Sequence, residues 1–374
     1  MQYTEYELGE LLPFEQPTAY IVKSTDYSDA YATPVLTAGK SFILGKTNET
    51  DGIFDQLPVI IFDDFTTATQ FVNFRFKVKS SAMKILHINT DLVIPKYIFY
   101  RLQIIQFDHS THKRYWIQSY SKIKVLIPPL DEQFRIVARI EELFSELDKA
   151  VDTLKTTKEQ LEVYRQAVLK DAFSDFEKKD SIRNLTMVVT SGSRGWAKYY
   201  SNSGALFVRI GNLTHSGIDI DFRDIQHITP PDNAEGVRTR LQPNDVLVSI
   251  TADLGSIGFV SEKVEEAYIN QHIALVRFQN PVQGRFMAWY LRSEYGQKDL
   301  LKNKRGGGKL GLGLDDIRDT PVPIVSDLVA QKTVDEIEER LSVCDSIEKT
   351  VDATLAQADA MRQSILKQSF EEKI

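Results

Sequence analysis

The sequence predicts an α+β protein: two globular domains separated by two long antiparallel helices, arranged as a pseudo-twofold internal repeat. Three observations support this class, namely a duplicated helical segment, coiled-coil spacing within each copy, and clusters of strand-like runs before each copy. The 374 residues also exceed the usual size of a single hydrophobic core. The predicted boundaries are 1–127 for the first globular domain, 128–178 for the first helix, 179–325 for the second globular domain and 326–374 for the second helix.

The duplication joins residues 137–173 to residues 334–370 at a constant offset of 197. Of the 37 aligned positions 14 are identical, whereas unrelated sequences would match at about two. The identities include Ile140-Glu141-Glu142 with Ile337-Glu338-Glu339, Asp148 with Asp345, Arg165-Gln166 with Arg362-Gln363, and Phe173 with Phe370. Both copies are helical in pattern, so the chain consists of a globular domain and a helix, repeated once.

The helices are predicted from apolar residues at alternating spacings of three and four, the spacing of a coiled-coil seam. Residues 130–173 contain neither proline nor glycine, and 44 helical residues would extend about 66 Å. The two helices are expected to pair with each other, and an intermolecular coiled coil is the alternative. The predicted seam residues are Ile136, Ile140, Leu143, Leu147, Leu154, Leu161, Val334, Ile337, Leu341, Val351, Leu355 and Ile365.

Each globular domain shows strand-like runs followed by one helix. In the first domain the expected strands are 59–62, 71–76 and 83–86, and the expected helix is 95–102. In the second domain the expected strands are 205–210, 245–250 and 273–276, and the expected helix is 286–292. The layouts match but the sequences do not, which suggests two binding surfaces of one kind with different targets.

Composition and charge narrow the class of protein. The chain is 42% hydrophobic, has no apolar run of 18 residues and starts without a signal-peptide profile, so we expect a cytoplasmic protein. Its single cysteine, Cys344, excludes an internal disulfide and is expected to be buried. Of the net charge of −7, residues 131–179 contribute −3 and residues 326–374 contribute −5, leaving +1 for the rest. This balance permits DNA binding without indicating it.

No convincing catalytic constellation is present. Gly45-Lys46-Thr47 lacks the upstream glycine of a phosphate-binding loop, and Leu310 follows Arg305-Gly306-Gly307-Gly308-Lys309 where such a loop needs Ser or Thr. The six histidines show no metal-ligand spacing. Asp63-Asp64 could hold a metal, but no second acidic cluster completes a nuclease site. We therefore expect a non-enzyme, with an enzyme that uses Asp63-Asp64 as a minor alternative.

One segment carries a family resemblance. Pro128-Pro129-Leu130-Asp131-Glu132-Gln133, followed by Ile136-Val137 and Ile140-Glu141, resembles the start of the conserved helix in specificity (S) subunits of type I restriction–modification systems. The second copy, 325–331, lacks the Pro-Leu and Glu-Gln elements. Residues 34–40, 61–67 and 80–84 also resemble one recurring type of target-recognition domain. The resemblance extends over essentially the whole chain.

The resemblance implies a DNA-recognition subunit for phage defence and DNA methylation. Each globular domain would be a target-recognition domain for one half of a split, asymmetric sequence in double-stranded DNA. The helices would act as a ruler for the unread spacer, whose length is left open, and would dock two methyltransferase subunits. A rod of about 66 Å corresponds to about 19 base pairs of DNA, enough to hold two recognition domains on one duplex. S-adenosylmethionine would bind the methyltransferase, and ATP and magnesium the restriction subunit, so this chain would bind no cofactor, metal or membrane. The presence of a restriction subunit and the bases recognised are left open.

Base contacts require Arg, Lys, amide or hydroxyl side chains on loops, with other cations on phosphates. For each single residue, exposure on a solvated surface is the competing interpretation. A coiled-coil scaffold with two protein-binding domains is the competing function. The candidate DNA-binding residues are Lys40, Lys46, Thr66, Thr67, Lys113, Arg114, Ser193, Arg194, Lys198, Tyr199, Tyr200, Lys302, Lys304, Arg305 and Lys309.

Overall fold

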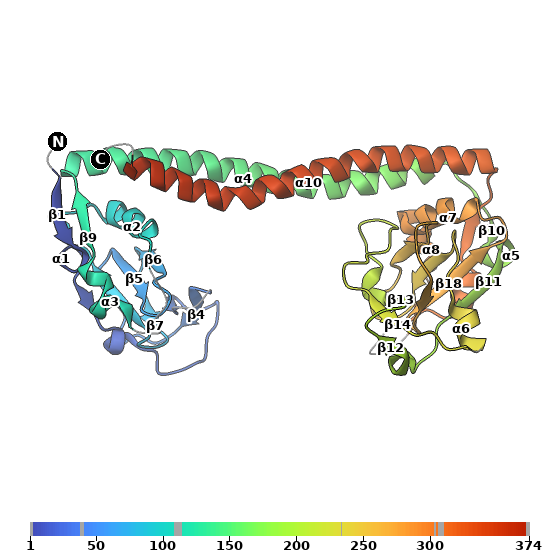
Figure 1. The fold of residues 1–374 in the computed structure, drawn as a ribbon, viewed down its shortest axis with the longest axis horizontal. Helices are drawn as coiled ribbons and strands as arrows, with labels where there is room; N and C mark the ends of the chain where they lie inside the picture. Colours follow the sequence, from blue (N-terminus) through green and yellow to red (C-terminus); the bar gives the residue numbers. More distant parts are fainter. Residues whose placement is uncertain are drawn as a thin grey trace. The chain divides into compact units, whose positions relative to one another are not determined.

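A computed structural model of the chain describes residues 3–37, 41–107, 114–232, 234–302, 304–305 and 310–371. The chain divides into two compact units: unit 1 comprises Met1–Leu154 and Asp352–Ile374, and unit 2 comprises Lys155–Val351. Each unit contains one globular region and part of each long helix (Figure 1). Within the described ranges no helix is long and apolar enough to cross a membrane. The predicted α+β class is confirmed.

The globular region of unit 1 contains three sheets. The four-stranded sheet has the order β2-β8-β5-β6, the three-stranded sheet the order β4-β3-β7, and β1 pairs with β9. The elements are β1 (Thr4–Glu7), α1 (Leu8–Leu11), β2 (Phe14–Glu15), η1 (Pro17–Tyr20), β3 (Thr33–Leu36), β4 (Ile43–Thr47), β5 (Val59–Asp63), β6 (Thr69–Val72), β7 (Lys77–Val78), β8 (Met83–His87), α2 (Pro95–Gln103), α3 (Tyr115–Gln118), η2 (Tyr120–Lys122) and β9 (Lys124–Ile127).

The globular region of unit 2 also contains three sheets, with the orders β11-β18-β15-β16, β12-β14-β13-β17 and β10-β19. Its elements are β10 (Lys178–Ser181), α5 (Ile182–Leu185), β11 (Thr186–Ser191), η3 (Trp196–Tyr199), β12 (Tyr200–Ser201), β13 (Ala205–Val208), η4 (Ile210–Asn212), β14 (Gln226–Ile228), α6 (Ala234–Thr239), β15 (Val246–Ser249), β16 (Ile257–Phe259), β17 (Ala267–Ile269), β18 (Ile273–Phe278), α7 (Gln283–Arg292), α8 (Glu294–Leu300), α9 (Leu314–Arg318) and β19 (Pro321–Pro323).

The two globular regions share one topology. In both four-stranded sheets the first strand pairs with the last, the last with a middle strand, and the middle strand with the one that follows it. In both, the second sheet contains one parallel pair, β3·β7 in unit 1 and β13·β17 in unit 2. A two-stranded antiparallel sheet joins the start of each region to the strand before its long helix. The internal repeat therefore includes the globular regions as well as the helices.

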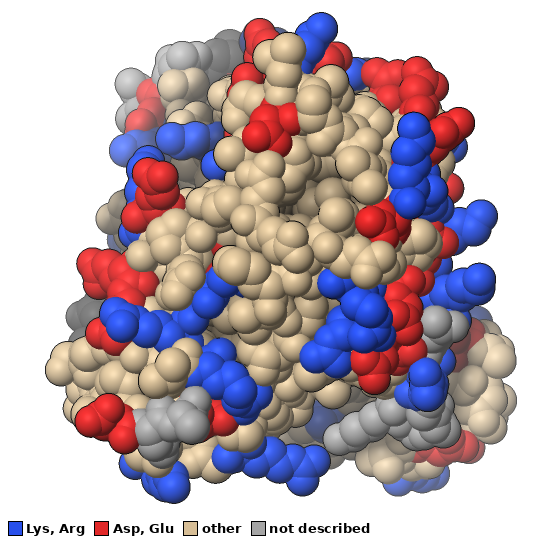
Figure 2. All heavy atoms as spheres, turned by 90° about the vertical axis from the view of Figure 1, so that its right-hand side faces the viewer, with Lys and Arg blue, Asp and Glu red and all other residues tan. Residues whose placement is uncertain are grey.

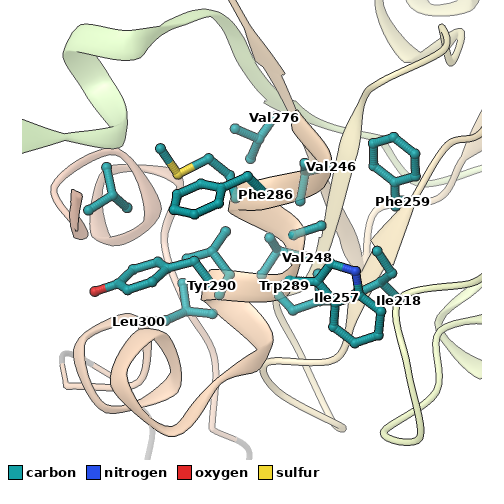
Figure 3. Close-up of a cluster of buried hydrophobic side chains, with 14 of the residues drawn as sticks. Ile218, Val246, Val248, Ile257, Phe259, Val276, Phe286, Trp289, Tyr290 and Leu300 are labelled. Atoms are coloured by element: carbon teal, nitrogen blue, oxygen red, sulfur yellow. The ribbon is translucent and has the colours of Figure 1, made fainter. Parts of the chain in front are cut away.

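Alternating side chains position the main sheet of unit 2 between two cores. On β15, Val246 and Val248 face α7, whereas Leu247 faces the second sheet. Figure 3 shows the first core, in which Phe286 and Tyr290 of α7 lie beside these strand residues. The long helices α4 (Leu130–Phe173) and α10 (Asp327–Glu371) contribute Phe173 and Ile337 to the same core. Helix α7 thus lies between the sheet and the helix pair.

Two predicted strands are too long. The predicted strand 71–76 ends at Val72, and a separate strand begins at Lys77. The predicted strand 205–210 ends at Val208, because the side chain of Asn212 accepts the Arg209 N–H at 2.8 Å and a 3₁₀ turn follows. In the second case a local hydrogen bond replaces the ladder that the apolar pattern favoured. In the first case Phe76 instead forms an isolated antiparallel bridge with Phe54.

The helix pair is antiparallel within each unit, and the repeated residues explain the pairing. In unit 2, Arg165 of α4 contacts Asp345 of α10 at 2.7 Å. In unit 1 the equivalent residues contact each other with exchanged roles, Arg362 of α10 with Asp148 of α4. The repeated Asp and Arg therefore form one ion pair twice.

Two further repeated positions join the helices to the globular regions. Glu141 contacts Lys96 of α2 in unit 1, and its repeat Glu338 contacts Arg285 of α7 in unit 2. The hydrogen bond with Glu141 raises the pKa of Lys96. The aromatic residues that end the two copies make equivalent contacts. Phe370 packs edge-on against Tyr97 of α2, with ring centroids 5.4 Å apart, and Phe173 packs edge-on against Tyr290 of α7. Most of the repeated residues named above thus have a structural function.

The predicted seam residues lie on the inner faces of the helices. Eight of the twelve are buried: Ile136, Ile140, Leu147, Leu161, Val334, Ile337, Leu341 and Val351. The other four, Leu143, Leu154, Leu355 and Ile365, are half-buried. Several of the buried residues, including Ile140 and Ile337, also pack into the globular cores. The apolar stripe therefore contacts α2 or α7 in addition to the partner helix.

Gln133 explains the Glu-Gln element of the first helix. Its side chain is fully buried and its Oε1 accepts the Ile94 N–H at 2.8 Å. Its Nε2 donates to the carbonyl oxygens of Leu92 at 3.0 Å and Pro128 at 2.9 Å. In the second copy the aligned residue is Ala330, and the bonds run in the opposite direction, from Asn280 and Gln283 to Asp327 at the start of α10. The loss of the motif therefore reflects a different attachment of the helix.

The two repeated arginines, Arg165 and Arg362, are expected to stabilise their units to different extents. Arg165 is 8% exposed and bonds two carboxylates, Asp345 and Glu348, whereas Arg362 is 36% exposed and has the half-exposed Asp148 as its ionic partner. Arg165→Ala should lower the free energy of unfolding of unit 2 by about 2 kcal/mol, and Arg362→Ala that of unit 1 by less than about 1 kcal/mol. Hydrogen exchange of the helix amides measures both. Equal losses would contradict this ranking.

Candidate nucleic-acid interface

Three segments of unit 2 meet at one end of its main sheet. The register of β15 and β18 places Ser249 opposite Ile273, and the Ile250 N–H donates to the His272 carbonyl at 2.9 Å. The turn after β15 is thus beside the turn 270–272 before β18. The Leu312 N–H donates to the Ile250 carbonyl at 2.9 Å, which adds the segment after the glycine-rich loop. Because β18 runs from this cluster toward the connection with α7, the cluster lies at the opposite end of β18 from that connection.

The loop 192–199 lies against this cluster. A side chain at Gly192 would place its Cβ 2.5 Å from the Asn270 carbonyl, so only glycine allows this approach. Trp196 anchors the loop by stacking on Phe207, with ring centroids 5.0 Å apart. Glu235 accepts the Ser193 N–H at 3.0 Å and the Trp196 Nε1–H at 3.3 Å. These bonds leave Arg194 exposed on an anchored loop.

Two loops predicted to bind DNA line one hollow in unit 2. This hollow has a volume of 930 Å³, and Arg194 comes from one loop and Arg305 from the other. Arg305 donates to Asp316 at 2.8 Å, and Arg194 has no ionic or hydrogen-bonding partner among the described residues. Thr251 and His272 also line it. The structure therefore joins candidate residues that are more than a hundred positions apart in sequence.

A second hollow, of 640 Å³, is also bordered by this turn, through Asn270. Arg209, Arg223 and Asn270 line it together with Asp221 and Asp224. Hydrogen bonds from Arg223 lower the pKa of Asp221 to about 2, so this pair remains ionised at neutral pH. The turn 270–272 thus borders two hollows that each contain arginine.

Unit 1 has an equivalent arrangement. The turn after β5 contains Thr67 with a φ of 59°, and the turn after β15 contains Ala252 with a φ of 58°. Asp64, at the start of the first turn, accepts the Trp116 N–H at 2.9 Å and so holds the segment that begins at Arg114. Thr66, Thr67 and Arg114 are therefore brought together at the end of the main sheet.

Asp63 and Asp64 have structural roles. Asp64 forms a buried ion pair with Lys84 at 3.2 Å, and Asp63 accepts the Phe65 N–H at 2.9 Å within the turn. Within the described ranges no group of three His, Cys, Asp or Glu side chains could hold a metal ion. The ion pair and the turn hydrogen bond account for both carboxylates.

The remaining candidates lie in different settings. Lys46 is half-buried in β4, Tyr199 is half-buried against Trp196, and Lys198 lies over the Tyr199 ring. Tyr200, Lys302 and Lys304 are exposed. Lys40, Lys113 and Lys309 lie outside the described residues. Positive and negative side chains are interspersed on the face in Figure 2, in keeping with the near-neutral charge of the globular regions.

Sequence patterns missed five polar residues at this end of unit 2: Arg209, Arg223, Asn270, Gln271 and His272. Asn270, Gln271 and His272 form a short connection between strands, and Arg209 and Arg223 lie in the longer connection between β13 and β14. Their shared feature, a position at one end of two sheets, depends on strand order. The sequence Asn270-Gln271-His272, which places two amides and an imidazole just before a predicted strand, could have indicated this site.

Comparisons with known proteins identify the relatives of this chain. The specificity subunit of the type I restriction enzymes EcoR124I/EcoR124II from Escherichia coli is 45% identical over 174 residues, which cover 43% of each chain. The chain is a homologue of type I specificity subunits. The EcoBI specificity subunit from Escherichia coli is 24% identical over 277 residues, 65% of this chain and 57% of that one. The chain thus matches about half the length of these specificity subunits. No protein-family model matches it.

Solved structures extend the likeness to the whole fold. A chain in a structure of complex assembly and conformational transition of the type I R-M system has a TM-score of 0.70 at 16% identity, covering 100% of this chain and 98% of that one. The HsdS subunit from Thermoanaerobacter tengcongensis has a TM-score of 0.56 at 15% identity, covering 100% and 97%. The resemblance to specificity subunits predicted from the sequence is confirmed, and the fold is that of this type of subunit.

Proposed function

We propose that the chain is the DNA sequence-specificity subunit of a type I restriction–modification enzyme. Each globular region recognises one half of a bipartite, asymmetric target in double-stranded DNA. Helices α4 and α10, of 44 and 45 residues, set the spacer between the half-sites and dock two methyltransferase subunits. Restriction subunits are a further partner of the same complex.

The observation that carries this proposal is the duplicated topology with unlike loops. Two regions of the same strand order present different side chains at the same end of the main sheet, Thr66, Thr67 and Arg114 in one and Arg194, Thr251 and Arg305 in the other. Such a design suits two different half-sites. The homology with type I specificity subunits points to DNA as the ligand.

The chain acts as a non-catalytic subunit in this proposal. S-adenosylmethionine belongs to the methyltransferase subunit, and ATP and magnesium belong to the restriction subunit. The competing scaffold hypothesis rests on the acidic helices, and it predicts protein partners without sequence-selective DNA binding.

The test uses this chain coexpressed with its methyltransferase subunit. We expect a complex that binds one bipartite duplex more tightly than randomised duplexes, with an affinity that falls as salt rises. The methyltransferase subunit alone is the control and should show no such preference. Equal binding of target and randomised duplexes by the intact complex would refute the specificity function and favour the scaffold.

A further inference from the structure

The turn Asn270-Gln271-His272, which we call the polar ridge, borders both arginine-lined hollows of unit 2; Asn270 is buried, and Gln271 and His272 are half-buried. Asn270 lines the hollow of Arg209 and Arg223, and His272 lines the hollow of Arg194 and Arg305. In DNA recognition, cationic side chains bind phosphates and amide side chains contact base edges. Arginines beside a turn with two amide side chains provide both kinds of group.

A chain of hydrogen bonds orients the ridge. The Thr251 hydroxyl lies 2.6 Å from His272 Nδ1, and Gln271 Nε2 lies 2.8 Å from His272 Nε2. In the Nδ1–H tautomer, Nδ1–H donates to the Thr251 hydroxyl and Nε2 accepts from the Gln271 amide. The Asn270 side chain accepts the His272 N–H at 3.0 Å. Gln271 is therefore held with its amide oxygen and its second N–H unused by His272.

The four arginines beside this turn differ in whether a carboxylate already pairs with them. Arg209 and Arg223 are paired with Asp224 and Asp221, and Arg305 with Asp316. Arg194 is exposed and has no such partner among the residues described. Of these four arginines, Arg194 is the one that can bind a phosphate without first leaving a carboxylate.

We infer that the ridge Asn270–His272 is the base-contacting element of unit 2, with Gln271 presenting its amide to a base edge in the major groove. The donor and acceptor of a glutamine amide match N7 and N6 of adenine. His272 and Thr251 are positioning residues for Gln271, and Arg194 binds the DNA backbone. This inference rests on the proposed DNA-specificity function.

The equivalent connection in unit 1 supports the assignment. It joins β7 to β8 and contains Lys79, Ser80 and Ser81, all exposed. The same connection is therefore polar and exposed in unit 1 and polar and partly exposed in unit 2, while its side chains differ. That is the pattern expected where two half-sites differ in sequence.

The test compares two glutamines that flank the same strand, β18, in the complex of this chain with its methyltransferase subunit. Gln271 precedes β18 and Gln279 follows it, at the opposite end. For Gln271→Ala we expect about a tenfold or greater loss of discrimination at one base pair of one half-site, in selection from a randomised duplex library. The other half-site should be unchanged, and Gln279→Ala should keep both preferences.

Arg194→Ala provides a second test that does not depend on the ridge folding correctly. It should weaken binding to all duplexes similarly and reduce the slope of log affinity against log salt by about one. Unchanged half-site preferences in Gln271→Ala, or an unchanged salt slope in Arg194→Ala, would overturn the inference while leaving the DNA-specificity function in place. A wild-type complex without any sequence preference would instead refute that function.

Discussion

Replacing Asp64 with alanine is expected to lower the free energy of unfolding of unit 1 by about 3–5 kcal/mol. Lys84, the ionic partner of Asp64, is 1% exposed, so the variant leaves an ammonium group buried without its counter-charge. The Trp116 N–H also loses its acceptor, which releases the segment next to Arg114. Hydrogen exchange of β5 and β8 amides measures the loss.

A double variant separates the charge effect from simple loss of packing. Asp64→Asn keeps an acceptor for Trp116, and Lys84→Met removes the charge while keeping most of the volume. Together they should recover at least half of the stability lost in Asp64→Ala, because buried ion pairs contribute little beyond their own desolvation. If Asp64→Ala alone were as stable as the native chain, the buried pair would have no structural role.

Phe173→Ala is expected to destabilise unit 2 by about 3–5 kcal/mol. Phe173 ends the first repeated helix, is 1% exposed and packs against Phe286 and Tyr290 of α7, each with centroids 5.5 Å away. The change leaves a cavity between the helix and the globular core. Hydrogen exchange of α7 should increase, and that of α2 in unit 1 should remain unchanged.

Phe134→Ala is the matched control on the same helix. Phe134 is 63% exposed, so its removal should change stability by less than about 0.5 kcal/mol. Similar losses for the two phenylalanines, or an effect of Phe173→Ala in unit 1 alone, would show that the long helix does not attach to α7 through its aromatic end.

The helices were predictable because their signals are local. Apolar spacing, the absence of proline and the repeated identities located α4 and α10 to within a few residues. The repeat also held information that the spacing alone did not show: Asp148 and Arg165 recur because each pairs with the other's repeat. The apolar stripe also contacts α2 or α7 in addition to the partner helix. This second contact could not be predicted from the helix sequences, because it depends on how the globular cores pack.

The candidate interface was only partly predictable because it depends on strand order. Arg194 and Arg305 were proposed separately, and their common hollow arises from the Gly192–Asn270 approach and the Ile250–Leu312 hydrogen bond. Gln271 was missed because a short polar break before a strand is common. The sequence indicated only that each region has strands followed by one helix. It did not indicate that the strand orders match, because strand pairing and register are set by contacts distant in sequence.

The central claim is that this chain selects the DNA sequence that its complex modifies. The most direct measurement is single-molecule methylome sequencing of a host that expresses the methyltransferase subunit with and without this chain. We predict adenine methylation at one split, asymmetric motif only when the chain is present, with one half of that motif altered by Gln271→Ala. Identical methylated motifs with and without the chain would contradict the account.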